Sequence, residues 1–484
     1  MIDFRPILHI CGLLLIVMAV AMLVPALADL TSRNPDWMVF MASAAITLFV
    51  GGSIALSTRT GQTIELSRRQ AFALTASAWL SVSLAGALPL LFYGGRLGFA
   101  DALFESISGL TTTGATVLTG LESLPPGILL WRSLMQWIGG VGVVLMAMIM
   151  LPFLGVGGMQ LFETESSERS GRIVPRARQF VAYIGSIYAG LTLLCFLLYW
   201  LFGMSPFDAL NHAMTTLSTG GYSTHDASFG HFREPSLHWT ATIFMLAGGI
   251  PFVAYIRFVR GHRHALYDDV QIRAFVAFLF CLSALLGLWL VLSGNAASLG
   301  EGLRLAAFNV TSIVTTTGYA STDYTLWGPL AVGLFFALTF IGGCTGSTAG
   351  GIKIYRHQIL WLAVRAYVRQ LTRPNRVDVL SYGGLHVTRD IQASVLAFLA
   401  VFVGAFSLTA VLLAAMGLDF VTAISASATA FTNVGPGLGE IIGPSGNFAD
   451  LPDEAKWVLS GAMLLGRLEL FTILILLDPD FWRS

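Results

Sequence analysis

The chain has 484 residues, of which 55% are hydrophobic and only 11% are charged, and its formal net charge is +0. So few charges among so many apolar residues exclude a soluble globular protein and indicate a protein of the lipid bilayer. About 20 helical residues cross a hydrocarbon core roughly 30 Å thick. Apolar runs of this length predict ten spans, at 7–28, 38–56, 71–94, 128–154, 179–203, 237–259, 272–293, 328–363 (interrupted), 391–417 and 456–477.

The first two spans form a unit of their own, residues 1–66. Arg5 at the start and the small residues Ala26 and Ala28 near the end are features that a cleavable signal peptide also shows. The apolar run between them is longer than the core of a usual signal peptide. We therefore expect a retained transmembrane helix pair.

A repeated pattern follows. The segment Ala102–Gly114 recurs 204 residues later as Ala306–Gly318, with Ala, Phe, Ser, three Thr and Gly in register, and weaker copies lie at Asp208–Gly221 and Ala423–Gly435. In each copy a spanning helix precedes a half-length apolar stretch, a Thr/Gly loop and a second span. The pattern predicts an all-α integral membrane fold with four pseudo-symmetric helix–pore loop–helix repeats around one central pore, at 67–170, 171–265, 266–385 and 386–484.

The four loops have the chemistry of a potassium filter. Non-helical backbone at membrane depth is tolerated only when protein buries it or when it lines a water-filled path. Rings of backbone carbonyls replace the water of K⁺ in selective filters, and Gly reaches the backbone dihedrals that this needs. The C-terminal end of each half helix adds a negative dipole that favours a cation. No catalytic group is required, so we expect no enzyme.

A Gly-rich run interrupts the eighth span. Five glycines lie in ten residues, at Gly342, Gly343, Gly346, Gly350 and Gly351. Each Gly costs a helix about 1 kcal/mol relative to Ala, so a loop is favoured over close helix packing. A phosphate-binding P-loop is disfavoured, because no Gly-Lys-Ser/Thr ends the run and no strand precedes it. Lys353 follows, either near the inner mouth of the pore or simply as the anchor of the span.

The last span contains a charge in its middle, Arg467, followed by Glu469. A central Arg costs roughly 2.5–3.5 kcal/mol on insertion scales, which favours a functional role. We hypothesise that Arg467 repels cations and restrains flux. The alternative is a structural ion pair between Arg467 and Glu469, but residues two apart on a helix do not face each other.

The charges between the spans indicate orientation. With both termini cytoplasmic, 20 of the 27 Lys and Arg residues fall on the inner side, as the positive-inside rule requires. The outer side then holds 15 carboxylates, including Asp29 and Glu105, and six cations, including Arg132. Such a surface would concentrate cations, although ordinary solvated loops would look the same.

Several stretches together resemble the Trk/Ktr/HKT potassium transporter superfamily, specifically the TrkH-type membrane subunit of the bacterial Trk system. These are Ala102–Val117, Gly220–Ser228, Ile341–Gly351, Gly435–Glu440 and Gly466–Glu469, and the resemblance covers essentially the full length. It implies channel-like potassium uptake, with Rb⁺ accepted and Na⁺ less so, across the bacterial inner membrane. It also implies a homodimer with one pore per subunit and a cytosolic nucleotide-binding regulatory subunit, with no organic cofactor and no nucleic acid.

The resemblance also assigns residues. It places the filter at Thr112, Thr113, Gly114, Ser218, Thr219, Gly220, Thr316, Thr317, Gly318, Asn433, Val434 and Gly435, and the gate at Gly342–Gly351 with Lys353 and Arg467. The fourth loop departs most, because Asn-Val replaces Thr-Thr. A secondary transporter that couples K⁺ to H⁺ or Na⁺ is the alternative, but it would need intramembrane carboxylates, for which only Glu469 is a clear candidate.

Overall fold

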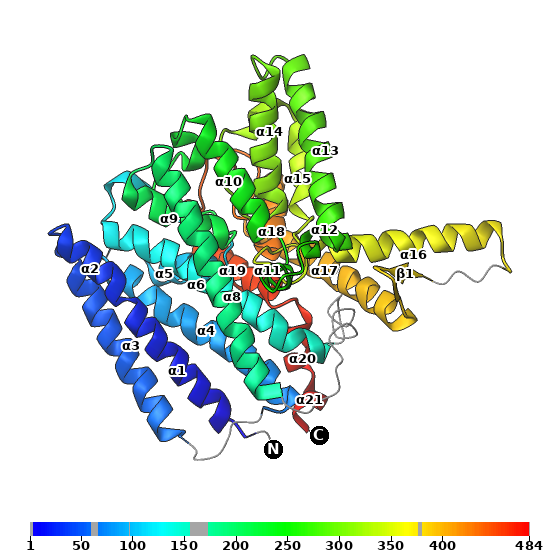
Figure 1. Ribbon diagram of the computed structural model, residues 1–484. Helices are drawn as coiled ribbons and strands as arrows, with labels where there is room; N and C mark the ends of the chain where they lie inside the picture. Colours follow the sequence, from blue (N-terminus) through cyan, green and yellow to red (C-terminus); the bar gives the residue numbers. More distant parts are fainter. Residues whose placement is uncertain (1–2, 60–65, 96, 155–172, 376–379, 484) are drawn as a thin grey trace.

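The computed structural model describes residues 3–59, 66–95, 97–154, 173–375 and 380–483, and it is built almost entirely of helices (Figure 1). The longer helices are α1 (Arg5–Ala21), α2 (Leu23–Thr31), α3 (Trp37–Ser57), α4 (Arg68–Phe92), α5 (Phe99–Leu110), α6 (Pro126–Leu154), α8 (Ile173–Leu201), α9 (Pro206–Leu217), α10 (Pro235–Gly248), α11 (Phe252–Val259), α13 (Val270–Leu292), α14 (Leu299–Val314), α15 (Pro329–Thr339), α16 (Ile354–Thr372), α17 (Arg389–Ala415), α18 (Phe420–Thr432), α19 (Asp453–Arg467) and α20 (Phe471–Leu477). Short helices α12 (Ala265–Asp268) and α21 (Pro479–Arg483) and the hairpin of β1 (Ser381–Tyr382) and β2 (Leu385–His386) complete the chain.

The helices form four similar units, which confirms the predicted fold class. Each unit has a long first helix, a half helix and a second helix: α4–α5–α6, α8–α9–α10, α13–α14–α15 and α17–α18–α19. The half helices have 12, 12, 16 and 13 residues, so each is about 18–24 Å long and too short to cross a bilayer. The expected boundary between the first two repeats, at residues 170 and 171, lies outside the described residues.

Three predicted spans are broken. Among the described residues, seven helices are long and apolar enough to cross a membrane, and two bent pairs would each make one more. The prediction of continuous spans at 237–259 and 456–477 was wrong, because α10 and α11 meet at 92° and α19 and α20 at 109°. Pro251, which lacks an N–H, lies in the first break directly before α11, and Glu469 and Leu470 take positive φ at the second. The predicted interruption of the eighth span separates α15 from α16.

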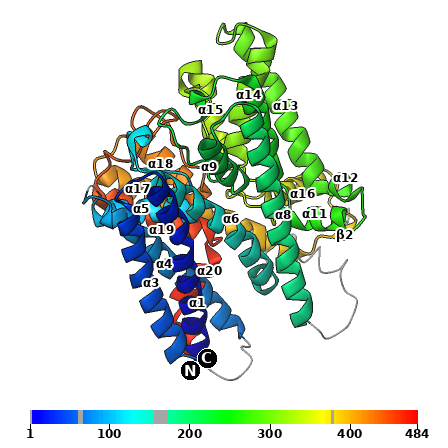
Figure 2. The ribbon, with the colours of Figure 1, turned by 60° about the vertical axis from the view of Figure 1, so that its left-hand side comes forward.

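The N-terminal pair packs on the first repeat. α1 lies against α3 and α4, and α2 lies against α3 and α6. The N- and C-termini lie beside each other at one end of the molecule in both views (Figure 2). Helices α1 and α3 approach closely where Gly12 meets Gly51, since a Cβ on Gly51 would lie 2.7 Å from Leu15 Cβ. Small residues permit such close approach between membrane helices.

This contact provides a matched test of helix packing. Gly51→Ala should force α1 and α3 apart and destabilise the protein by about 1–3 kcal/mol. Gly52→Ala is the control, because a Cβ there meets nothing within 4 Å and Ala is the better helix former. We expect a lower apparent melting temperature in detergent for Gly51→Ala alone. Equal melting temperatures for the two variants would show that the close contact does not exist.

Candidate functional site

The four half helices end in loops with one shared backbone pattern. The last turn of each is followed by a non-glycine residue with left-handed backbone: Thr112 (φ 52°), Thr219 (52°), Thr316 (59°) and Asn433 (55°). Two residues later comes a glycine with positive φ, at Gly114, Gly221, Gly318 and Gly435. We call residues 111–114, 218–221, 315–318 and 432–435 the Thr/Gly loops. Their repetition of an uncommon conformation shows that they are structural equivalents.

The register of the second Thr/Gly loop differs from the expectation. The sequence comparison aligned Gly220 with Gly114, but Gly221 has the equivalent backbone conformation. Gly220 instead occupies the place of Thr113, Thr317 and Val434. Two adjacent glycines make the two alignments indistinguishable from the sequence, so Gly221 was missed.

The loops close into a ring. A Cβ on Gly114 would overlap the carbonyl oxygen of Gly220, one on Gly221 that of Thr317, and one on Gly318 that of Val434. The ring closes where a Cβ on Gly435 would lie 2.7 Å from the Thr113 oxygen. Each loop therefore needs its glycine to admit the carbonyl of the next. All twelve residues assigned to the filter from the sequence belong to these four loops, and all are buried except Gly114 and Gly318, which are partly exposed.

Side chains bind neighbouring loops together. Asn433 Nδ2 donates to Thr113 Oγ1 at 2.9 Å and to the carbonyl of Met463 at 3.0 Å. The Thr215 and Tyr319 hydroxyls lie 2.5 Å apart and connect the second and third repeats. The Asn that departs from the Thr pattern is thus the residue that joins the fourth loop to the first.

A buried ion pair lies behind the first and second loops. Arg132 Nε donates to Glu105 Oε1 at 2.8 Å, with side chains 1% and 0% exposed. The guanidinium lies 4.1 Å from the centre of the Tyr222 ring, and the Tyr222 hydroxyl donates to the Glu105 carbonyl at 2.9 Å. The sequence placed Glu105 and Asp29 among the outer carboxylates, either to concentrate cations or in ordinary solvated loops, but both are 0% exposed and belong to neither kind of surface. Their place inside apolar helices was the signal that could have identified them.

The Gly-rich loop 342–351 is a loop, as predicted, and it fills the break between α10 and α11. Cys344 N donates to the Gly249 carbonyl at 3.0 Å, and Thr348 N to the Gly248 carbonyl at 3.2 Å. These bonds satisfy carbonyls that the bend leaves without helical partners. The Gly342 N–H donates to the Ile352 carbonyl at 2.9 Å, so the loop doubles back on itself.

The same loop contacts the ring directly. Gly350 N donates to Thr316 Oγ1 at 2.6 Å, and Thr219 Oγ1 donates to Thr348 Oγ1 at 3.2 Å. A Cβ on Gly350 would overlap the Thr432 carbonyl. Three of the four Thr/Gly loops therefore touch the Gly-rich loop.

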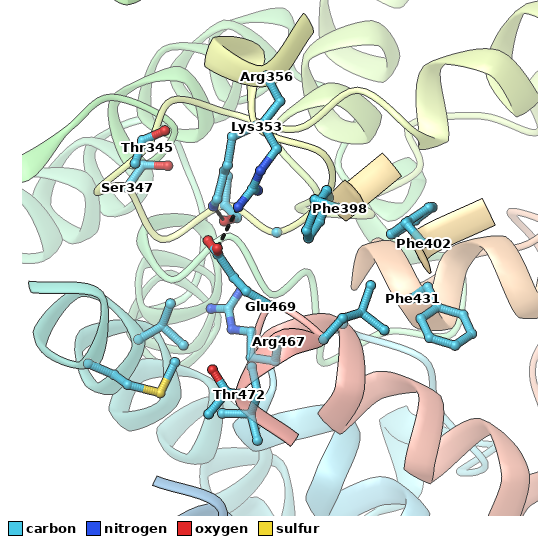
Figure 3. A pocket seen from close by; sticks show the side chains of 18 of the residues that line it. Thr345, Ser347, Lys353, Arg356, Phe398, Phe402, Phe431, Arg467, Glu469 and Thr472 are labelled. Atoms are coloured by element: carbon cyan, nitrogen blue, oxygen red, sulfur yellow. Dashed lines mark hydrogen bonds and ion pairs between the residues drawn. The ribbon is translucent and has the colours of Figure 1, made fainter. Parts of the chain in front are cut away.

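Charged side chains surround a small cavity beside this loop (Figure 3). Arg467 Nη2 donates to the Thr348 carbonyl at 2.9 Å, while its buried Nε and Nη1 have no partner among the described residues. Lys353 Nζ donates to the Ala349 carbonyl. Glu469 pairs with Arg356 at 2.6 Å rather than with Arg467, so the alternative of an Arg467–Glu469 pair is not formed. Arg356, at the start of α16, was missed as a site residue.

The cavity is positively charged and small. Its volume is about 40 Å³, which holds no more than a few water molecules. Lys353, Arg356, Arg467 and Glu469 line it, which gives a formal charge of +2. An entering cation would meet both a narrow space and an unfavourable field.

A second cavity lies on the opposite side of the ring. The positive-φ glycine of each Thr/Gly loop lines it, together with His225 and Asp226, and its volume is about 70 Å³. His225 lies 3.6 Å from Asp208 Oδ1 and 3.5 Å from Glu122 Oε1. Asp208, with a smaller contribution from Glu122, raises the pKa of His225 above its usual value.

Comparisons with known proteins agree with this arrangement. Residues 37–483 match the family model TrkH, described as cation transport protein. The chain is 46% identical to the Trk system potassium uptake protein TrkI of Halomonas elongata, over 99% of this chain and 97% of the relative. It is 35% identical to the Trk system potassium uptake protein TrkH of Escherichia coli, over the whole of both chains.

A solved structure is similar over the whole chain. The crystal structure of the potassium transporter TrkH from Vibrio parahaemolyticus has a TM-score of 0.92 and 36% identity, with 100% of both chains covered. The resemblance drawn from the sequence motifs is thereby confirmed, as is the expectation of a transport protein rather than an enzyme. The chain belongs to the TrkH family of cation transport proteins.

Proposed function

We propose that the chain takes up potassium through the ring of Thr/Gly loops by a channel-like mechanism. The observation that carries the proposal is the closed ring of four glycine–carbonyl contacts at the C-terminal ends of four half helices. Helix C-termini and backbone carbonyls both favour a cation without demanding a charged side chain. Rb⁺, which resembles K⁺ in size, would be accepted, and Na⁺ less well.

The Gly-rich loop is the proposed gate. It contacts three Thr/Gly loops, and Arg467 is bonded to its Thr348 carbonyl, so a movement of this loop would change the ring and the charged cavity together. The loop continues into α16, which offers a route by which a cytosolic nucleotide-binding subunit would act on it. We assign Lys353 to the inner mouth, next to Arg467.

Coupled transport is less well supported. A carboxylate that carries H⁺ or Na⁺ must be free to bind it, whereas Glu469 is held by Arg356 and Glu105 by Arg132. Each of these carboxylates is neutralised by a buried arginine, which indicates a structural role and not the binding of a second ion.

We propose an inner-membrane homodimer with one pore per subunit and cytoplasmic termini. Helix α16 extends sideways beyond its neighbours in Figure 1 and exposes an apolar stripe that would suit a second copy or lipid. The stripe consists of Trp361, Val364, Val368 and Leu371.

The transport mechanism can be tested with purified protein in liposomes. Uptake of radioactive Rb⁺ down its own gradient should proceed with no pH difference and no Na⁺ present, because a channel needs no second ion. Protein-free liposomes provide the background. Uptake that stops whenever the H⁺ or Na⁺ gradient is removed would support the coupled transporter instead.

The role of Arg467 can be tested in the same assay. A unit charge about 8 Å from a passing cation adds ~2 kcal/mol at an effective dielectric constant of about 20, or at most a roughly 30-fold reduction in rate. Arg467→Ala should therefore increase Rb⁺ flux per protein. Arg389→Ala removes the same charge from an exposed position on α17 and should leave flux unchanged. Flux that stays equal or falls in Arg467→Ala would refute the electrostatic role.

A further inference from the structure

One side chain from outside the Thr/Gly loops is bonded into the ring. Gln136 lies on α6, is 0% exposed, and reaches the second loop of the ring. Its Nε2 donates to the Gly220 carbonyl at 2.6 Å, and its Oε1 accepts from the Tyr222 N–H at 3.0 Å. Both ends of the Gly220–Tyr222 segment are thus held by one amide.

Gln136 occupies the space of a side chain that the second loop lacks. A Cβ on Gly220 would overlap Gln136 Cδ and would lie 2.8 Å from its Nε2. The equivalent positions carry Thr113, Thr317 and Val434. Thr113 Oγ1 is 2.7 Å from Thr111 Oγ1 and Thr317 Oγ1 is 2.8 Å from Thr315 Oγ1, so these loops are braced internally. The second loop has no such hydroxyl at Gly220.

The amide occurs at only one of the matching helix positions. Gln136 is ten residues after Pro126, which starts α6; ten residues after Pro235 in α10 is Met245, and ten after Pro329 in α15 is Thr339. Of these three residues, only Gln136 has an amide side chain. It bonds the second Thr/Gly loop, and among the four loops only this one has a glycine, Gly220, directly before its positive-φ glycine. The amide on α6 therefore fills the space that the missing side chain at Gly220 leaves.

We propose that Gln136 is a positioning residue that sets cation selectivity by fixing the peptide units of Gly220 and Gly221. The inference rests on the proposed filter. Glycine has the widest backbone freedom, and two in succession would let the Gly220 carbonyl turn away from its place against Gly114. The amide holds that carbonyl, which keeps the spacing of the ring uniform. Its loss should change the choice of ion more than the amount of folded protein.

The test compares Rb⁺ uptake with and without excess Na⁺ in liposomes that contain the full chain. Gln136→Met preserves bulk and introduces the residue found in α10, but it removes both hydrogen bonds. We expect Na⁺ to compete about fivefold better, the factor that corresponds to ~1 kcal/mol for one net hydrogen bond. Ser133→Ala is the matched control, because its buried hydroxyl donates to Leu129 of the same helix, and its competition should equal that of the parent.

A second arm separates this inference from the proposed filter. Gly318→Ala inserts a Cβ into the contact between the third and fourth loops and should disturb selectivity if the ring is the filter. Altered competition in Gly318→Ala together with parental competition in Gln136→Met would overturn the role of Gln136 and leave the filter standing. Parental competition in both variants would overturn the filter, and the role of Gln136 with it.

A rescue experiment covers the case in which Gln136→Met does not fold. Gly220→Thr alone should abolish uptake, since the new side chain would overlap Gln136. Gln136→Ala alone should lose discrimination. The double variant Gln136→Ala/Gly220→Thr gives the second loop the Thr of the first and third, and it should recover selectivity relative to Gln136→Ala. A double variant no more selective than Gln136→Ala would contradict the proposal.

Discussion

The structure depends on one constraint, the need to satisfy backbone that leaves helical geometry at membrane depth. Four half helices end there, and each delivers a loop whose amides and carbonyls have no regular partners. The loops meet this need by packing on each other in a closed ring, where the glycine of each loop admits the carbonyl of the next. The Gly-rich loop solves the same problem for α10, because its amides bond the carbonyls freed at Gly248 and Gly249.

Buried charges divide into two kinds around this ring. The Arg132–Glu105 pair is complete, since its groups bond each other and the backbone of two repeats, and it supports the first two loops from behind. Arg467 bonds one carbonyl and keeps two guanidinium nitrogens without partners among the described residues. A buried charge without a full set of partners is costly to retain, and Arg467 lies beside the proposed gate. In the proposed mechanism, Arg132 supports the structure and Arg467 restrains the ion.

The sequence predicted the features that repeat. Thr-Thr-Gly segments in matched settings identified four units, and five glycines in ten residues identified the loop at 342–351. The sequence did not predict features that depend on a single residue. Because Gly220 and Gly221 are adjacent, it could not fix the register of the second loop. It also gave no signal for the bends at Pro251 and at Glu469 and Leu470. The partners of Glu105 and Glu469 lie 27 and 113 residues away, so no local pattern could name them. The contact of Gln136 with the second loop, on which its proposed role rests, joins residues 84 positions apart and has no local signal in the sequence.

The proposed ion path passes through the ring of Thr/Gly loops. The most direct measurement is a crystal structure of the chain in Rb⁺, with the ion located by its anomalous scattering. If the ring is the ion path, an Rb⁺ peak should lie within the four loops, beside the carbonyls of Thr113, Gly220, Thr317 and Val434. An empty ring, with the Rb⁺ peak instead at Glu469 or Glu105, would contradict it.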